Sequence, residues 1–151
     1  MAVALYLSIV AFDNVTDYDS NYQYVRHVLM MDTTFPGNHE MWRAIARPSV
    51  HTAFYVGIIA WEALTAALCW WGAGRLMRRL GAAREEFHRA KGVAVAGLTA
   101  GCLLWLVAFL TVGGEWFLMW QSKLWDGREA AFRMFVVFGL LLVYLCSPEL
   151  E

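Results

Sequence analysis

The sequence predicts an all-α integral membrane protein, a polytopic bundle of four transmembrane helices with an interfacial helical segment on its outer face. Hydrophobic residues make up 60% of the 151 residues, well above the roughly 45 to 50% of an ordinary soluble domain. They collect in long runs, and about 20 mostly apolar residues let a helix cross a hydrocarbon core. A chain of this length suits one domain, so we treat residues 1–151 as a single membrane domain.

Four apolar runs are candidates for the spans. The run over residues 1–12 is too short to cross alone, because twelve residues at 1.5 Å each reach only about 18 Å. Either its helix continues through Asp13 and Asn14 into the headgroups, or the chain begins in mid-membrane, and we favour a truncated or late start. The other runs meet or approach the required length, and they cover residues 51–74, 92–112 and 130–146.

The basic residues indicate the orientation of the chain. Residues 75–91 contain six Lys or Arg, whereas residues 113–129 contain two. Short loops rich in Lys and Arg remain in the cytoplasm. We therefore expect residues 75–91 to be cytoplasmic, and residues 13–49 and 113–129 to lie together on the outer face.

The outer segment, residues 13–49, is expected to contain helix rather than only loop. Apolar residues recur near helical spacing from Tyr22 to Met30, after polar residues that suit a helix N-cap. This pattern predicts an interfacial helix that begins near Asn21.

A turn and a second short helix follow in the same segment. Pro36 suits the first central position of a turn, and Gly37 suits the positive φ of its second. The turn is therefore predicted over residues 35–38. The short helix, over residues 39–46, would end before Pro48, because proline disfavours helical geometry in the residue before it.

Two charged residues lie deep within the predicted spans. Glu62 would cost about 2.5 to 3.5 kcal/mol if it faced lipid as an anion, so it must face the bundle. Counted along the helices at about 1.5 Å per residue, Glu62 lies about 20 Å from the cytoplasmic end and Arg133 about 21 Å. Their matched depth predicts a buried Glu62–Arg133 ion pair, which is either a clamp that fixes helix register or part of a proton or ion relay.

A second polar group is expected just beneath the outer surface. Glu115 follows two glycines that permit a break in the helix, and solvation at the interface is one explanation for its charge. It is also placed to join His51, Arg43 and Arg47 in a cluster where a quinone headgroup or polar substrate would bind.

The sequence predicts no metal, cofactor or nucleic-acid site. Its three cysteines lie in apolar runs without metal-ligand spacing. An EF-hand match that starts at Asp17 fails at Tyr22, where glycine is required, and at Val28. His51 is the only histidine near a span, so the facing pair of a bis-His haem site is not expected. A formal net charge of −1 provides no basic field for nucleic acid.

Gly97 and Gly101 form a G-x-x-x-G pair within the predicted span 92–112. Two small residues at this spacing let another helix backbone approach closely. The partner helix is equally well expected within the chain or in a second copy.

Three strings in the sequence carry a family resemblance, FDNVTDYDSNYQYVRHVLMMDTTFP, MWRAI and GGEWFLMWQSKLW. They resemble a bacterial family of predicted small integral membrane proteins whose function is not assigned, and the resemblance covers almost the whole chain. It implies a location in the bacterial inner membrane and four spans, with the Asp-rich and Trp-containing segments on one side. The charge pattern makes that side the periplasmic one. It implies no catalytic residues.

Our leading functional hypothesis is a non-catalytic accessory, assembly or interaction subunit that contacts lipid and either other membrane proteins or a second copy of itself. The outer segments are rich in Tyr, Trp and Arg, which dominate binding interfaces. A small oligomeric transporter or proton-conducting protein that uses Glu62 and Arg133 is the alternative. A quinone-linked redox protein that uses the outer polar cluster is a third hypothesis. The sequence contains no nucleophile–base pair, metal-ligand spacing or phosphate loop, so it favours a non-catalytic role over an enzymatic one without deciding between them.

Overall fold

The computed structural model describes residues 1–147, and every regular element in that range is a helix. Three helical stretches are long and apolar enough to cross a membrane, namely Pro48–Met77, Arg84–Trp116 and Arg128–Cys146. The shorter helix Ala2–Thr16 is also apolar. The predicted helical membrane bundle is therefore confirmed. The elements are α1 (Ala2–Thr16), α2 (Tyr18–Met30), the 3₁₀ turn η1 (Met41–Arg43), α3 (Pro48–Met77), α4 (Arg84–Ala90), α5 (Gly92–Leu103), the π-helix η2 (Leu104–Trp116), the 3₁₀ turn η3 (Met119–Gln121) and α6 (Arg128–Cys146).

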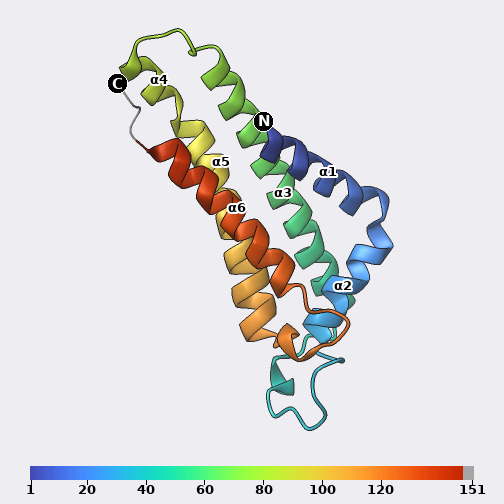
Figure 1. Cartoon of the computed structure of the whole chain (residues 1–151). Coiled ribbons are helices and arrows are strands. Elements are labelled where there is room, and N and C mark those ends of the chain that lie inside the picture. Colours follow the sequence, from blue (N-terminus) through green and yellow to red (C-terminus); the bar gives the residue numbers. More distant parts are fainter. Residues whose placement is uncertain (148–151) are drawn as a thin grey trace.

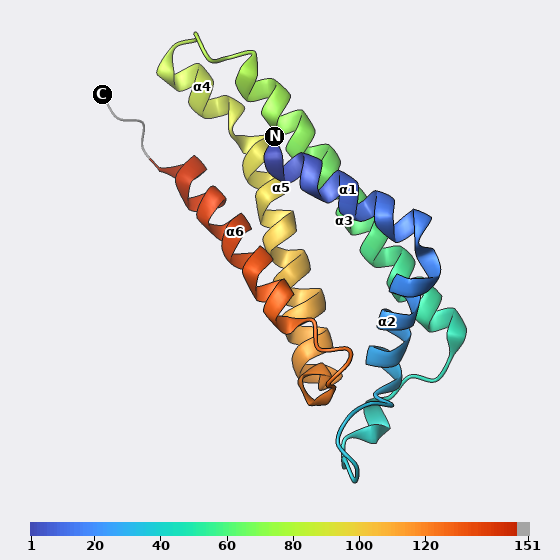
Figure 2. The same cartoon turned by 45° about the vertical axis from the view of Figure 1, so that its right-hand side comes forward.

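The long helices lie side by side and make the molecule elongated (Figures 1 and 2). α5 packs between α3 and α6. On the other side of α3, α1 crosses it obliquely, and α2 lies beside the first half of α3, which begins at Pro48. Two apolar clusters hold these helices together. One is centred on Leu104, Trp105 and Phe138, and the other on Leu29, Tyr55 and Phe117.

The first apolar segment continues past its predicted end. α1 runs through Asp13 and Asn14 to Thr16, and the helix direction changes at Asp17, which has φ −107° and ψ 51°. The interfacial helix then begins at Tyr18, three residues earlier than expected, and ends at Met30. α1 and α2 thus form one broken helical path along α3.

The turn after α2 forms as predicted. Gly37 has φ 78°, and the Asn38 amide donates to the carbonyl of Phe35 at 3.2 Å. The predicted helix over residues 39–46 is wrong in extent, since only η1 is helical. The chain is extended at Ala44, with ψ 134°, and the Ile45 amide donates to the Leu29 carbonyl instead of continuing a helix.

Gly97 and Gly101 face two helices of the same chain. A Cβ atom on Gly97 would lie 2.9 Å from Cys69 Sγ of α3, and a Cβ atom on Gly101 would overlap the Phe138 ring of α6. The G-x-x-x-G pair therefore lets α5 approach one helix on each side. Intramolecular packing occupies the surface that a second copy would have used.

We predict that Gly101→Ala destabilises the bundle by about 1 to 3 kcal/mol, because the added methyl group overpacks against the ring of Phe138. The matched control is Gly139→Ala, since a Cβ atom on Gly139 meets nothing within 4 Å. Unfolding of both variants in mixed micelles would measure the difference. Equal stability of the two variants would contradict this packing.

Candidate functional site

Glu62 lies in the middle of α3 and is buried, with 1% of its surface exposed. One carboxylate oxygen, Oε2, accepts a hydrogen bond of 2.7 Å from Nδ2 of Asn14. Among the described residues, no cation forms an ion pair with Glu62 and no donor reaches its second oxygen. A buried carboxyl group with one free oxygen is a polar group available for binding or proton transfer.

The break between α1 and α2 provides the partner for Glu62. Asn14 lies in the last turn of α1, where backbone carbonyls lose their helical partners. The Tyr55 hydroxyl donates to the free Asn14 carbonyl at 2.7 Å and lies 3.3 Å from Asn14 Oδ1. Tyr18, at the start of α2, packs edge-on against Tyr55 at 4.8 Å between ring centroids. The end of α1, the start of α2 and one face of α3 are thereby joined around Glu62.

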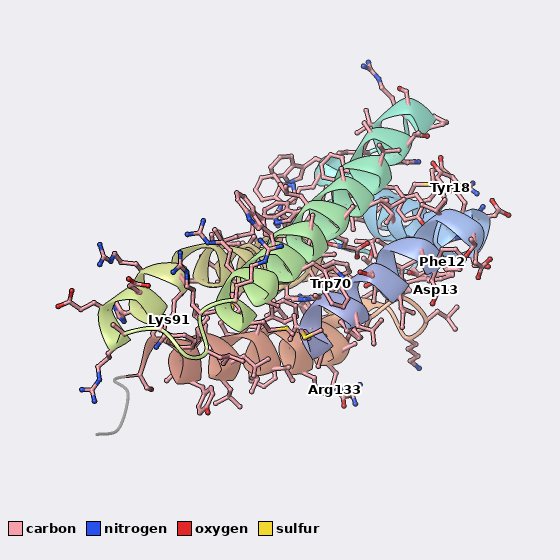
Figure 3. All side chains as sticks on the ribbon, turned by 90° about the horizontal axis from the view of Figure 1, so that it is seen from above. Phe12, Asp13, Tyr18, Trp70, Lys91 and Arg133 are labelled. Carbon is pink, nitrogen blue, oxygen red and sulfur yellow. The ribbon has the colours of Figure 1, made fainter. Side chains whose placement is uncertain are left out.

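The structure does not contain the predicted Glu62–Arg133 ion pair. Arg133 points away from the other helices (Figure 3), and its side chain is 68% exposed and lies 3.8 Å from Glu129 on the same helix. α6 buries Ala131 and Phe138. Arg133 follows Ala131 by two residues, a rotation of about 200° around the helix, so it faces outward. Equal depth along the two helices does not produce an ion pair, because the rotation of α6 about its own axis turns Arg133 away from Glu62.

A chamber of about 280 Å³ opens beside the carboxyl group of Glu62. Its polar walls come from four elements and include Asn14, Asn21, Tyr24, Tyr55 and Trp105. Trp105 is buried, and its indole Nε1 has no hydrogen-bond partner. A buried N–H without an acceptor costs about 1 to 3 kcal/mol. The chamber therefore offers the free carboxyl oxygen of Glu62, whereas the Trp105 N–H is covered by other protein atoms.

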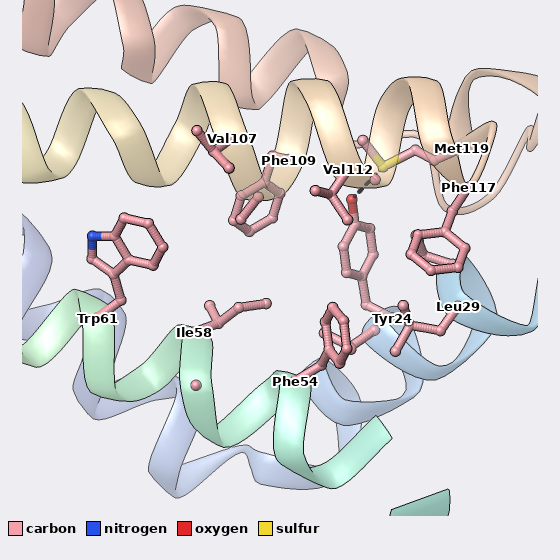
Figure 4. Close-up of a pocket in the computed structure, with 15 residues that line it drawn as sticks. Tyr24, Leu29, Phe54, Ile58, Trp61, Val107, Phe109, Val112, Phe117 and Met119 are labelled. Atoms are coloured by element: carbon pink, nitrogen blue, oxygen red, sulfur yellow. Dashed lines mark hydrogen bonds between the residues drawn. The ribbon is translucent and has the colours of Figure 1, made fainter. Parts of the chain in front are cut away.

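An apolar groove of about 330 Å³ adjoins this chamber. It runs between α3 and η2 and is closed at one end by Tyr24, Leu29 and Phe117 (Figure 4). The Tyr24 hydroxyl donates to the Met119 sulfur at 3.0 Å. Burial, with a smaller contribution from the nearby Asp126 charge, raises the pKa of Tyr24 to about 12. Tyr24 is thus a neutral donor at physiological pH and forms part of the wall of both spaces.

The groove and chamber share the π-helix η2 as one wall. Hydrogen bonds across five residues mark this geometry, including that from the Phe117 amide to the Val112 carbonyl at 3.0 Å. π-Helical geometry is rare and is frequently found at functional sites. Trp105 and Phe109 both project from η2 and pack together at 4.9 Å between ring centroids.

The structure divides the predicted outer polar cluster among separate places. His51 is buried, and its Nε2 bonds to the Ile45 carbonyl at 2.7 Å. Glu115 lines a shallow depression with Asp126 and Arg128 near the start of α6, where hydrogen bonds from Arg128 hold the pKa of Asp126 below its usual range. Within the described chain, no hydrogen bond or ion pair joins any two of the predicted cluster residues, which are His51, Glu115, Arg43 and Arg47.

Arg43 instead belongs to an aromatic surface at the same end of the molecule. Its guanidinium lies 5.2 Å from the centroid of Trp42 and 4.8 Å from that of Trp116. It also pairs with Glu40 at 2.7 Å and donates to the Trp116 carbonyl at 3.3 Å. We call this surface the outer cap, and its exposed large side chains are Phe35, Met41, Trp42, Trp116, Trp120 and Leu124.

Sequence reasoning identified Glu62 but missed the residues around it. The sequence indicates Asn14 only as part of the end of the first helix, and Tyr55 and Trp105 fall within the predicted spans 51–74 and 92–112 without a role of their own. A polar residue near the end of a short first helix was the one signal that pointed to Asn14. No pattern in the sequence indicates which way Trp105 faces, because the π-helix changes the rotation of every residue after Leu103.

The comparisons with known proteins agree with this membrane architecture. A family model described as predicted small integral membrane protein (DUF2165) matches residues 1–148. The chain belongs to this family. No curated protein and no solved structure matches it. The family description supports an integral membrane protein, and the site itself has to indicate what the protein does.

We predict that Asn14→Ala lowers the free energy of unfolding by about 1 to 3 kcal/mol, because it leaves the buried Glu62 carboxyl without its donor. The control is Asn21→Ala, since the Asn21 amide bonds only to the exposed Asp17 carbonyl at 3.3 Å. Both variants would be unfolded in mixed micelles. An Asn14→Ala protein as stable as the control would show that the Asn14–Glu62 bond contributes little.

Proposed function

We propose that the protein is a non-catalytic accessory subunit of a bacterial inner-membrane complex and that the outer cap is its docking surface. The observation that carries this proposal is the arrangement of Arg43 between Trp42 and Trp116. Trp and Arg residues dominate the binding energy of protein interfaces. Trp42 is 70% exposed, so its side chain contributes little to the packed core and is available to a partner.

The cap is held in place by contacts between two segments far apart in the sequence. Thr33 donates to the Ser122 hydroxyl at 2.8 Å, and the Phe35 amide donates to the Gln121 side chain at 3.1 Å. Phe35 and Trp120 pack edge-on at 5.8 Å between centroids. A surface fixed before binding loses less conformational entropy on association. This supports an interface rather than a mobile loop.

The charge distribution supports the orientation in this proposal. The basic residues 75–91 follow α3 at the end of the molecule opposite the cap (Figure 1). By the positive-inside rule, residues 75–91 are cytoplasmic and residues 13–49 and 113–129 are periplasmic. The partner is then another membrane protein with an apolar, aromatic face at the periplasmic surface. The charge of Arg43 is already balanced by Glu40, so no acidic partner is required.

We predict that Trp42→Ala reduces recovery of the native complex from mild detergent at least about tenfold, as expected for an interface hot spot. Trp71→Ala is the matched control, because Trp71 is 59% exposed on the part of α3 near residues 75–91. A photo-crosslinking residue at position 42 should give one protein adduct of discrete mass. An adduct of twice the mass of the chain would identify a second copy as the partner, whereas adducts with lipid alone would oppose the proposal.

A proton-conducting or transport function is the second candidate, and the burial of Glu62 beside a chamber favours it. Arg133 faces outward, so Glu62 would act with Asn14 and Tyr55 instead. Intramembrane acidic residues commonly mark ion and proton pathways. Three membrane-length helices and the shorter α1 leave little room for alternating access within one copy, so this function would require oligomerisation.

If Glu62 conducts, Glu62→Gln should abolish proton or solute flux into liposomes, because an amide does not exchange a proton with the path. Glu115→Gln is the matched control at an exposed position, and its flux should equal that of the unmodified protein. The measurement is a pH-sensitive dye trapped in the liposomes. Flux that Glu62→Gln leaves unchanged would remove this candidate.

A further inference from the structure

A basic hollow lies between the last turns of α3 and the short helix α4, at the end of the molecule opposite the outer cap (Figures 1 and 2). Its volume is about 540 Å³, and its charged lining residues are Arg75, Arg78, Arg79, Glu86 and Arg89. Four arginines and one glutamate give this lining a formal net charge of +3. We propose that the hollow, which we call the arginine pocket, binds the phosphate headgroup of an anionic phospholipid. The proposal is independent of the outer cap.

Two of the four arginines are available to a ligand. Glu86, the acidic residue in the lining, is already paired with Arg79 at 2.9 Å. Among the described residues, no hydrogen bond or ion pair involves the side chain of Arg75 or Arg78, and both residues are exposed. Guanidinium groups bind phosphate oxygens through paired N–H donors. The pocket therefore offers two unoccupied phosphate-binding groups.

The pocket lies where α3 leaves the hydrocarbon core. α3 has 30 residues, so it is about 45 Å long at 1.5 Å per residue, whereas the core is about 30 Å thick. The ends of α3 therefore extend into the headgroup layers. Trp71 belongs to a residue type enriched at this boundary, and Arg75 and Arg78 lie about 6 and 10 Å beyond it along the helix. The two arginines are thus at the depth of the lipid phosphates.

Helical spacing places the aromatic and basic side chains on one face of α3. Arg75 and Arg78 follow Trp71 by four and seven residues, and residues at these intervals share a face of a helix. Trp71 is 59% exposed and also lines the pocket. This face therefore presents an apolar ring beneath two guanidinium groups. A phospholipid has the same order, with acyl chains beneath a phosphate, whereas inorganic phosphate would contact the arginines alone.

The two walls of the pocket are held in place by the fold. α3 and α5 touch at the base of the pocket, since a Cβ atom on Gly72 would lie 2.5 Å from the Ala94 Cα atom. α4 ends at Ala90, immediately before α5, so the approach of α5 also positions α4. The Arg79–Glu86 ion pair joins the loop after α3 to α4. Walls that are fixed before binding reduce the entropy lost when a ligand binds.

The charge of the pocket favours an anionic headgroup over a zwitterionic one. Phosphatidylcholine carries a quaternary ammonium group that offsets its phosphate and would lie near the arginines. Phosphatidylglycerol carries the phosphate charge without a cation. Basic clusters next to a membrane-spanning helix attract such anionic lipids. The positive-inside rule explains why residues 75–91 are basic, but it does not require four arginines to line one hollow.

The test uses the full chain in detergent micelles, with short-chain phosphatidylglycerol added at increasing concentration. Bound lipid is measured by native mass spectrometry. Phosphatidylglycerol should bind at least about tenfold more tightly than phosphatidylcholine of the same chain length. Arg75→Gln and Arg78→Gln should each weaken the binding of phosphatidylglycerol about fivefold, because each removes one phosphate-binding group.

The matched control is Arg84→Gln. It removes the same charge from the same segment, but Arg84 does not line the pocket, so phosphatidylglycerol should bind this variant as it binds the unmodified protein. Each of the three variants keeps the other five basic residues of residues 75–91, so the effect on orientation is also matched. All three should unfold at the same temperature, because the substituted arginines are exposed.

Inorganic phosphate distinguishes the two sources of a phosphate group. Added as a competitor, it should fail to displace phosphatidylglycerol at equal concentration, since it makes no contact with Trp71. Displacement at equal concentration would overturn the proposal and assign the pocket to a soluble anion.

Two further results would also overturn it. One is equal binding of phosphatidylglycerol and phosphatidylcholine. The other is equal binding by the Arg75, Arg78 and Arg84 variants, because this would indicate a diffuse surface charge rather than a pocket. None of these results affects the outer-cap complex at the opposite end, so the two proposals fail separately.

Discussion

The hydrogen bond from Asn14 to Glu62 is the interaction on which the centre of this molecule depends. A carboxyl group halfway along a membrane-spanning helix is costly unless a protein donor meets it. The donor comes from the end of α1, and α1 can present it because the helical path breaks at Asp17. Tyr55 then satisfies the Asn14 carbonyl that the break exposes. The contacts of Asn14 and Tyr55 thus join the end of α1 and the start of α2 to one face of α3.

The π-helix has a comparable effect on the other side of the central space. By widening the turn from Leu104 onward, η2 places Trp105 and Phe109 toward α2 and α3. The close approach of α5 to its neighbours at Gly97 and Gly101 brings η2 near enough to form a wall. The small residues Gly97 and Gly101 let the helices touch along α5, and the bulky residues Trp105 and Phe109 hold them apart along η2. A groove and a chamber remain where the helices separate.

The two proposed activities use different parts of the molecule. The outer cap consists of two loop segments fixed to each other by hydrogen bonds and ring contacts, and it presents exposed tryptophan side chains. The chamber lies among the helices and presents a free carboxyl oxygen of Glu62. No single residue belongs to both, so substitutions can change the outer cap and the chamber separately.

The sequence by itself determined the membrane architecture, the turn at Gly37 and the need for Glu62 to face inward. These follow from local properties, since span length, turn geometry and the cost of a charge in lipid are carried by the residues concerned. The sequence also gives the depth of a residue along its helix, from the rise per residue, and by this measure Arg133 and Glu62 lie at the same depth. The rotation of α6, set by burial of Ala131 and Phe138, was decided only by tertiary packing, and it turned Arg133 outward. The same holds for Asn14 and Trp105, because a helix break and a π-helix place side chains in ways that regular periodicity does not predict.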